Sequence, residues 1–292
     1  MFLERFLKYL QFEKRYSSHT LIAYKTDLLS FSKFLELIDL EIQFANHQII
    51  RSWMVSLMDQ SIDPRSINRK ISTLRSFYKF LLREKVVKEN PVLKIQTPKT
   101  SKRLPNFISD DKLSDLLDNQ VFENDFFGLR DKLVLELLFG TGIRLSELLG
   151  IKEKDVYLEE KTLKVLGKRN KERIVPINHS LVELLKQYFN DKKVQLFLND
   201  SEVLIVTNTG SPAYPKLIYR IVNKYLSLIS TQEKKSPHVL RHSFATSLLN
   251  NGADINAIKD LLGHASLAAT QVYTHNSIER LKFIYKQAHP KA

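Results

Sequence analysis

Apolar residues recur at helical spacing along most of this 292-residue chain, and no other feature constrains its fold as strongly. Such stripes predict amphipathic helices that each bury one face. Two regions interrupt the pattern: a basic, proline-containing stretch over residues 97–105, and three short β-type runs between residues 155 and 176. We therefore expect a mainly α-helical protein with a small antiparallel β-sheet, divided into two domains.

The segment before the basic stretch predicts four helices with short connections. Their apolar stripes lie within residues 2–15, 20–38, 47–58 and 65–83. Polar residues at 17–20 and the pair Asp63-Pro64 are typical helix starts, and Asn90-Pro91 ends the group. Four helices so close in sequence form a small bundle. We expect residues 1–96 to be a helical domain and residues 97–105 to be an exposed linker.

Positive charge is concentrated in the first 104 residues of the chain. The whole sequence has 45 Lys and Arg against 32 Asp and Glu, a net charge of +13, and residues 65–103 alone have 12 against 2. This excess favours a polyanion such as nucleic acid. We expect phosphate-backbone contacts from the polar face of the fourth helix and from the linker, through Arg65, Arg69, Arg75, Lys79, Lys99, Lys102 and Arg103.

The second domain, residues 106–292, mixes helices with short strands. A strongly apolar helix over residues 128–139 is expected at its centre and ends at Gly140-Thr141-Gly142. The predicted strands are residues 155–157, 162–166 and 173–176, with a hairpin tip at 167–171. Further helices are expected at residues 109–117, 143–149, 181–189, 216–228, 237–250, 254–262 and 278–288.

Some classes of protein are excluded or disfavoured. The chain has no cysteine, which rules out disulfides, thiol catalysis and thiolate zinc sites and fits a reducing compartment. We find no apolar run long enough to span a bilayer and no signal-peptide pattern. A cytoplasmic protein without a membrane partner is the expectation.

Candidate chemistry begins at residues 236–242. Ser236 suits an N-cap and Pro237 the first helical position, while His238 and Arg241 lie on one side of the helix, an arrangement that suits phosphate binding. Each further candidate has an ordinary structural explanation when taken alone: a surface ion pair, an exposed lysine, a helix end or a core tyrosine. These candidates are Arg144 with Glu147 one turn later, Lys168, His264 and Tyr273.

Taken together, these side chains suit phosphoryl transfer to a tyrosine nucleophile without a metal. They stand in the segments TGIRLSEL (141–148), GKRNKERIVP (167–176), HVLRHSFAT (238–246), LLGH (261–264) and TQVYTH (270–275). In this order the segments resemble the signature of the tyrosine recombinase (lambda-integrase type) family, closest to its Xer branch, over nearly the whole chain. Arg169 departs from the glycine that many relatives have there.

The resemblance implies a role for each matching residue. Arg144 and Arg241 would bind the scissile phosphate, and Glu147 would orient Arg144. Lys168 would protonate the departing 5′ oxygen, and His238 and His264 would assist proton transfer. Tyr273 would be the nucleophile and form a covalent 3′-phosphotyrosyl intermediate.

The family also implies an assembly and excludes cofactors. Site-specific recombination would need no metal or other cofactor. It would take place on double-stranded DNA with inverted half-sites, in a homo-tetramer or in a hetero-tetramer with a sister recombinase. The apolar tail after Ser277 would dock on the neighbouring protomer, the alternative being its own domain. The small size, with no arm-binding domain before Phe2, favours an Xer-like enzyme or an invertase over a lambda-like integrase, and we expect the Xer-like function, chromosome dimer resolution.

Several alternatives stay open from the sequence. A DNA invertase, a mobile-element integrase and a type IB topoisomerase would use a similar set of residues. His238 and His242 are spaced to share a metal, which would suit a metallohydrolase, although Arg241 between them would repel the ion. A DNA-binding protein without catalysis would be expected to lack Tyr273 or one of the arginines.

Overall fold

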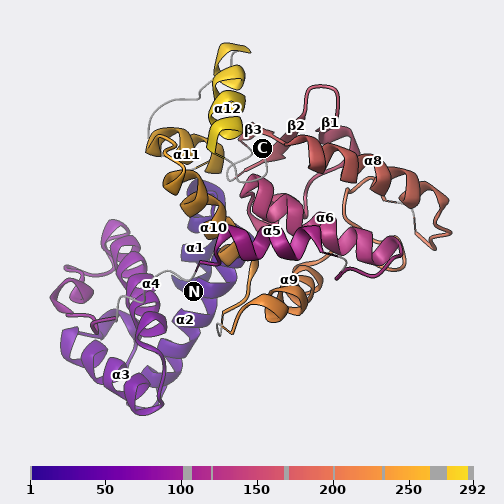
Figure 1. Cartoon of the computed structure of the whole chain (residues 1–292). Coiled ribbons are helices and arrows are strands. Elements are labelled where there is room, and N and C mark those ends of the chain that lie inside the picture. The colour runs from indigo at the N-terminus through magenta and orange to yellow at the C-terminus, as the bar shows by residue number, and fades with distance from the viewer. Residues whose placement is uncertain are drawn as a thin grey trace. The chain divides into compact units, whose positions relative to one another are not determined.

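The computed structural model describes residues 2–100, 107–119, 121–167, 171–199, 201–231, 234–263 and 275–288. The chain forms two compact units, residues 1–103 and 104–292, each with a hydrophobic core of its own (Figure 1). Within the described residues, no helix is both long enough and apolar enough to cross a membrane.

The first unit is a helical bundle. α1 (Phe2–Lys8) continues as a short π-helix (Tyr9–Glu13), and α2 (Ser18–Glu36), α3 (His47–Asp59) and α4 (Pro64–Arg83) follow, with 3-10 turns at Ile42–Phe44 and Pro91–Lys94. Side chains cap these helices where the sequence predicted helix starts: the Ser17 hydroxyl accepts a hydrogen bond from the Thr20 amide, and the Asp63 carboxylate from the Arg65 amide. The four expected helices are confirmed.

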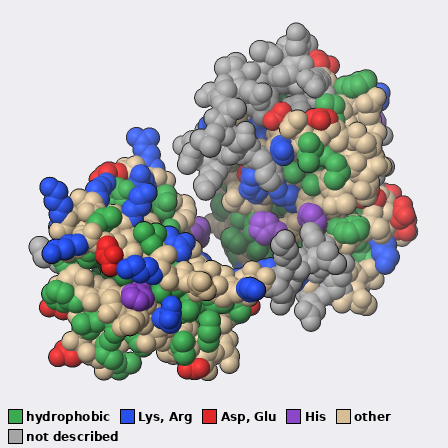
Figure 2. All heavy atoms as spheres, turned by 90° about the vertical axis from the view of Figure 1, so that its left-hand side faces the viewer, with side chains coloured by type: hydrophobic (Ala, Val, Ile, Leu, Met, Phe, Trp, Pro, Cys, Tyr) green, Lys and Arg blue, Asp and Glu red, His purple; other side chains and the backbone are tan. Residues whose placement is uncertain are grey.

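Helix α4 presents opposite faces to the core and to solvent. Its predicted apolar stripe is fully buried: Ile67, Ile71, Leu74, Tyr78 and Leu81. Its four expected DNA contacts, Arg65, Arg69, Arg75 and Lys79, are exposed. Figure 2 shows many lysine and arginine side chains on the surface of this unit.

A buried carboxylate ties α2 to α4. Asp27 of α2 is fully buried, and its oxygens accept hydrogen bonds from Arg69, from the Lys70 ammonium at 3.3 Å and from the Thr73 hydroxyl at 2.9 Å. Arg69, which we expected to bind DNA, is therefore also an internal ion-pair partner, although half of its side chain stays exposed.

The second unit surrounds its central helix. The helices are α5 (Asp110–Asp118), α6 (Phe126–Thr141), α7 (Leu145–Leu148), α8 (His179–Val194), α9 (Pro215–Ile229), α10 (Pro237–Asn250), α11 (Ile255–Leu262) and α12 (His275–Ala288). Helix α6 is buried along nearly its whole length and packs against α5, α8, α9 and α10, because apolar residues occupy all its faces. The predicted helix at residues 143–149 is shorter, a single turn after Arg144.

A small sheet lies beside these helices. Strands β1 (Val156–Tyr157), β2 (Thr162–Leu166) and β3 (Glu172–Pro176) are antiparallel in the order β1-β2-β3, after a 3-10 turn at Glu153–Asp155. Arg173 pairs with Val165 in this register. The predicted fold class, mainly helical with a small antiparallel sheet, is confirmed.

The last helix packs on its own unit in this structure, whereas we expected its apolar stripe to dock on a neighbour. The Tyr285 hydroxyl donates to the Gly140 carbonyl at 2.7 Å, and Tyr285 and Ala288 are buried in a cluster with Phe244 of α10 and Leu261 of α11. The helix begins at His275, so Ser277 lies inside its first turn and is not its N-cap. Phe283 remains 61% exposed.

We predict that Asp27→Asn lowers the free energy of unfolding by about 2 kcal/mol, because the buried amide presents donors to Lys70 and Thr73 where a carboxylate accepted from them. Urea denaturation measures this difference. The matched control is Asp59→Asn, an exposed carboxylate at the end of α3, which should change stability by less than about 0.5 kcal/mol. Equal stabilities for the two variants would contradict the structural role of Asp27.

Candidate active site

The end of α6 determines the position of Arg144. Gly142 adopts a left-handed conformation with φ of 61°, and its amide donates to the Leu138 carbonyl at 3.1 Å, which terminates the helix. A side chain here would clash, since a Cβ would lie 2.3 Å from the Phe244 ring. Helix α10 therefore packs directly on the turn, two residues before Arg144.

Glu147 holds Arg144 through two bonds. Its carboxylate accepts a hydrogen bond from the Arg144 backbone amide at 2.7 Å and another from the Arg144 guanidinium, also at 2.7 Å. Glu147 is buried, whereas the Arg144 side chain is 31% exposed. The sequence predicted this ion pair, and the structure adds that its carboxylate half lies in the interior.

Arg173 is a second, unpredicted partner of Glu147. Its guanidinium donates to both carboxylate oxygens at 2.8 and 2.9 Å, and its Nε donates to the Leu261 carbonyl at 3.1 Å. Arg173 and Val175 both lie on the buried face of β3. The signal that could have revealed this residue was an arginine at an inward position of an alternating strand.

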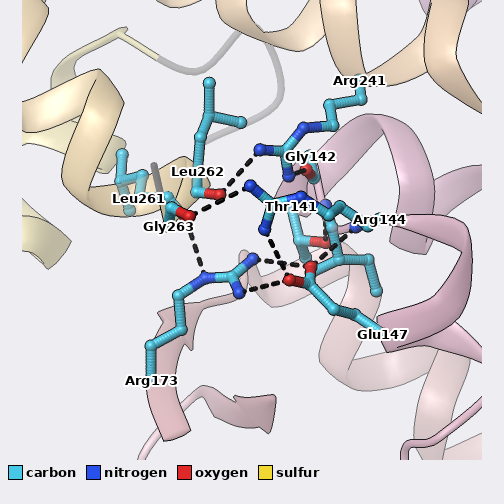
Figure 3. Close-up of polar contacts among 10 residues, drawn as sticks. Thr141, Gly142, Arg144, Glu147, Arg173, Arg241, Leu261, Leu262 and Gly263 are labelled. Carbon is cyan, nitrogen blue, oxygen red and sulfur yellow. Dashed lines mark hydrogen bonds and ion pairs between the residues drawn. The ribbon is translucent and has the colours of Figure 1, made fainter. Parts of the chain in front are cut away.

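Three arginines meet the carboxyl end of α11 (Figure 3). Arg173 binds the Leu261 carbonyl, Arg241 the Leu262 carbonyl at 2.7 Å, and Arg144 the Gly263 carbonyl at 3.0 Å. Arg241 of α10 also donates to the Gly142 carbonyl. The last carbonyls of a helix carry partial negative charge, which favours cations at this end. Arg144 and Arg241 are thereby brought side by side.

The electrostatics of the cluster favour an anion. Burial would raise the pKa of the Glu147 carboxyl, but the hydrogen bonds and charges of Arg173 and Arg144 lower it to about 2. Burial and repulsion by Arg144 lower the pKa of Arg241 to about 10. At neutral pH three cations thus surround one carboxylate, and the excess positive charge lies at the partly exposed Arg144 and Arg241.

The remaining expected catalytic residues are not all visible. His238 is exposed on α10, one turn before Arg241. Lys168, His264 and Tyr273 lie outside the described residues, although the structure describes the neighbouring Gly167, Lys171 and Gly263. Ser236 occupies the N-cap position of α10 without a side-chain capping bond.

The other expected contacts fall in the first unit. Lys99 is exposed, like the four expected contacts on α4, and Lys102 and Arg103 lie outside the described residues. Among the residues that the structure describes, no three His, Cys, Asp or Glu side chains are placed to share a metal ion.

We predict a pH-dependent effect of Glu147→Gln. The pKa of Glu147 is lower in the folded chain than its ordinary 4.5, so its ionised form adds stability that is complete above pH 4.5 and is lost as the pH falls toward 2. The variant should lose about 3 kcal/mol of unfolding free energy at pH 7.

Denaturant unfolding of both proteins between pH 7 and pH 3 tests this effect. The difference between wild type and variant should shrink as the pH falls below 4.5. Glu159→Gln, at an exposed carboxylate of the same unit, serves as the control. A difference that stays constant with pH would contradict the assignment of the low pKa to Glu147.

Known proteins resemble both units of the chain. Residues 3–85 match the phage integrase N-terminal SAM-like domain, and residues 106–280 match the phage integrase family. Tyrosine recombinase XerC of Chlorobaculum parvum is 39% identical, over 99% of this chain and 94% of the relative. Tyrosine recombinase XerD of Staphylococcus haemolyticus is also 39% identical, over 99% of each chain.

Solved structures share the fold. A XerH site-specific recombinase bound to a palindromic difH substrate superposes with a TM-score of 0.74 at 22% identity, covering 96% of this chain and 82% of the other. A lambda integrase dimer bound to a core site has a TM-score of 0.68 at 18% identity, covering 93% and 98%. The chain therefore belongs to the phage integrase family, as an Xer-like tyrosine recombinase, an enzyme that cleaves and rejoins DNA strands.

Proposed function

We propose that this chain recombines DNA at specific sites through a phosphotyrosyl intermediate on Tyr273, in the manner of Xer enzymes that resolve chromosome dimers. The observation that carries the proposal is the pair of guanidinium groups of Arg144 and Arg241. They are bound to successive carbonyls at the end of α11, immediately before the position of His264. A guanidinium has five N–H donors, so these groups have capacity left for phosphate oxygens.

The proposed reaction transfers the phosphoryl group from the 5′ oxygen of DNA to the tyrosine oxygen. The Tyr273 oxygen attacks the scissile phosphorus and loses its proton, with His238 or His264 as acceptor, and a bond to the 3′ phosphate forms. The bond from phosphorus to the 5′ oxygen breaks, and Lys168 supplies the proton that this oxygen takes up. Arg144 and Arg241 stabilise the charge on the non-bridging oxygens. Attack by a 5′ hydroxyl reverses these steps and rejoins the strand without a cofactor.

In this proposal the first unit binds DNA and the second carries out catalysis. Residues 1–96 form a core DNA-binding domain, 97–105 a linker along the duplex, and 106–292 the catalytic domain. The exposed cations Arg65, Arg75, Lys79 and Lys99 are free to face the phosphate backbone. Arg69 contributes less to this face than its charge suggests, since it is paired with Asp27.

Assembly completes the proposed function. Two protomers occupy inverted half-sites of one duplex, and two such complexes form a tetramer that exchanges strands, either of this chain alone or with a sister recombinase. The supporting observation is the near-full-length similarity to enzymes named XerC and XerD. The reaction acts on chromosomal DNA, which agrees with a cytoplasmic location.

We predict that Tyr273→Phe abolishes strand cleavage and leaves half-site binding nearly unchanged, since only the hydroxyl is removed. A nicked suicide DNA substrate carrying the target site, incubated in EDTA without ATP, traps the covalent protein–DNA complex of the wild type. Tyr219→Phe, a half-exposed tyrosine of α9, is the matched control and should form the complex normally. A covalent complex formed by Tyr273→Phe would place the nucleophile elsewhere.

We predict that Lys168→Ala slows cleavage of the natural phosphodiester by at least about 100-fold, the usual contribution of a general acid. On a substrate with sulfur in place of the 5′-bridging oxygen, the same variant should cleave at nearly the wild-type rate, because a thiolate leaves without a proton. Single-turnover rates on both substrates give the comparison, with Lys171→Ala as the neighbouring control. Equal defects on both substrates would exclude the acid role.

A further inference from the structure

One charged side chain at the candidate site has no role in the chemistry described so far. The Arg173 guanidinium is buried, as the 5% exposure of the residue shows, so it cannot reach DNA directly. Burying such a group is costly unless its donors are satisfied and its charge is paired. Glu147 provides the charge partner and Leu261 a carbonyl acceptor.

The position of Arg173 links the segments that carry the expected catalytic residues. Through Glu147 it reaches the ion pair that holds Arg144. Through Leu261 it holds the end of α11, where Arg241 also binds and after which His264 follows. Arg173 itself belongs to β3, the strand that leaves the hairpin carrying Lys168.

Gly263 allows this guanidinium to approach the backbone at the end of α11 closely, and Gly167 lies beside it at an ordinary contact distance. A Cβ at Gly263 would lie 3.0 Å from Nη1 and 3.1 Å from Cζ of Arg173, so the flat group packs directly against the helix end. A Cβ at Gly167 would lie 3.6 Å from both Arg173 Nη1 and Glu147 Oε1. Glu147 of α7 and the α11 terminus therefore contact the same planar group (Figure 3).

We propose that Arg173 is a positioning residue for strand cleavage, which acts through Glu147 on Arg144 and through the α11 end on Arg241. This inference rests on the proposed function of the same site. A lysine would keep the charge but lose the planar fork, which bonds both carboxylate oxygens and a carbonyl at once. The two phosphate-binding arginines then lose their alignment, and the chemical step slows while DNA binding does not.

The test uses Arg173→Lys in the full-length protein with two suicide half-site substrates. One carries the natural scissile phosphodiester. The other carries a methylphosphonate there, which lacks one charged non-bridging oxygen and depends less on well-placed arginines. Single-turnover strand cleavage at saturating protein and the half-site Kd are measured for variant and wild type. The variant-to-wild-type rate ratio on each substrate is the readout.

The expected result separates positioning from stability. Arg173→Lys should cleave the phosphodiester at least about tenfold more slowly than wild type, as misalignment of a catalytic group does. On the methylphosphonate the defect should shrink to about twofold or less, and the Kd should stay within about twofold of wild type. Both rates come from one preparation, so partial unfolding lowers them equally.

Arg130→Lys is the matched control. Arg130 is likewise buried and paired with the Asp131 carboxylate at 2.8 Å, but its other hydrogen-bond acceptors, the Asn208 side chain and the Val206 carbonyl, do not belong to the candidate site. Its replacement should affect stability and leave both cleavage rates per folded molecule close to wild type. If Arg173→Lys does not fold, Arg173→Gln takes its place in the same comparison.

Other outcomes overturn the inference and leave the proposed function standing. Wild-type cleavage by the Arg173 variant, equal defects on the two substrates, or a loss confined to half-site binding would each show that Arg173 does not align the arginines. Failure of the proposed function would look different, because the wild-type protein itself would form no covalent complex.

Discussion

The buried carboxylate of Glu147 is the interaction on which the candidate site depends. It is bonded to Arg173 from inside the domain and to Arg144 at the edge of solvent. One negative charge between two guanidinium groups makes the position of each group dependent on the other. The same charge offsets the free-energy cost of burying Arg173. Since Glu147 also accepts a hydrogen bond from the Arg144 backbone amide, it determines where α7 begins.

Helix ends supply the rest of the geometry. Gly142 and Gly263 both terminate helices in the left-handed conformation, where a side chain would be strained; at Gly142 it would also clash with Phe244, and at Gly263 it would press tightly on Arg173. The last carbonyls of α11 then attract Arg241 and Arg144. Their partial charge balances only part of the two cations, so the pair stays suited to an anion such as a phosphodiester.

The first unit shows a similar use of charge in its interior. Asp27 lies inside the bundle and holds Arg69 and Lys70 of α4, the helix whose outer face carries further cations. The number of basic residues on a helix therefore overstates its surface charge when some of them pair with a buried carboxylate. Among the expected contacts on α4, Arg65, Arg75 and Lys79 are exposed and not bonded to Asp27, so they are the better candidates for a phosphate backbone.

The sequence alone was sufficient for the helices, the three short strands, the division into two units and the identity of Arg144, Glu147 and Arg241 as candidates. These follow from local periodicity, from glycine and proline positions and from ordered motifs, none of which needs long-range contacts. It did not indicate that Arg173 belongs to the site, that Asp27 is buried, or that Tyr285 reaches the Gly140 carbonyl. Only the tertiary structure decides such facts, because each joins residues far apart in sequence, and a charge becomes an interior partner only when folding encloses it.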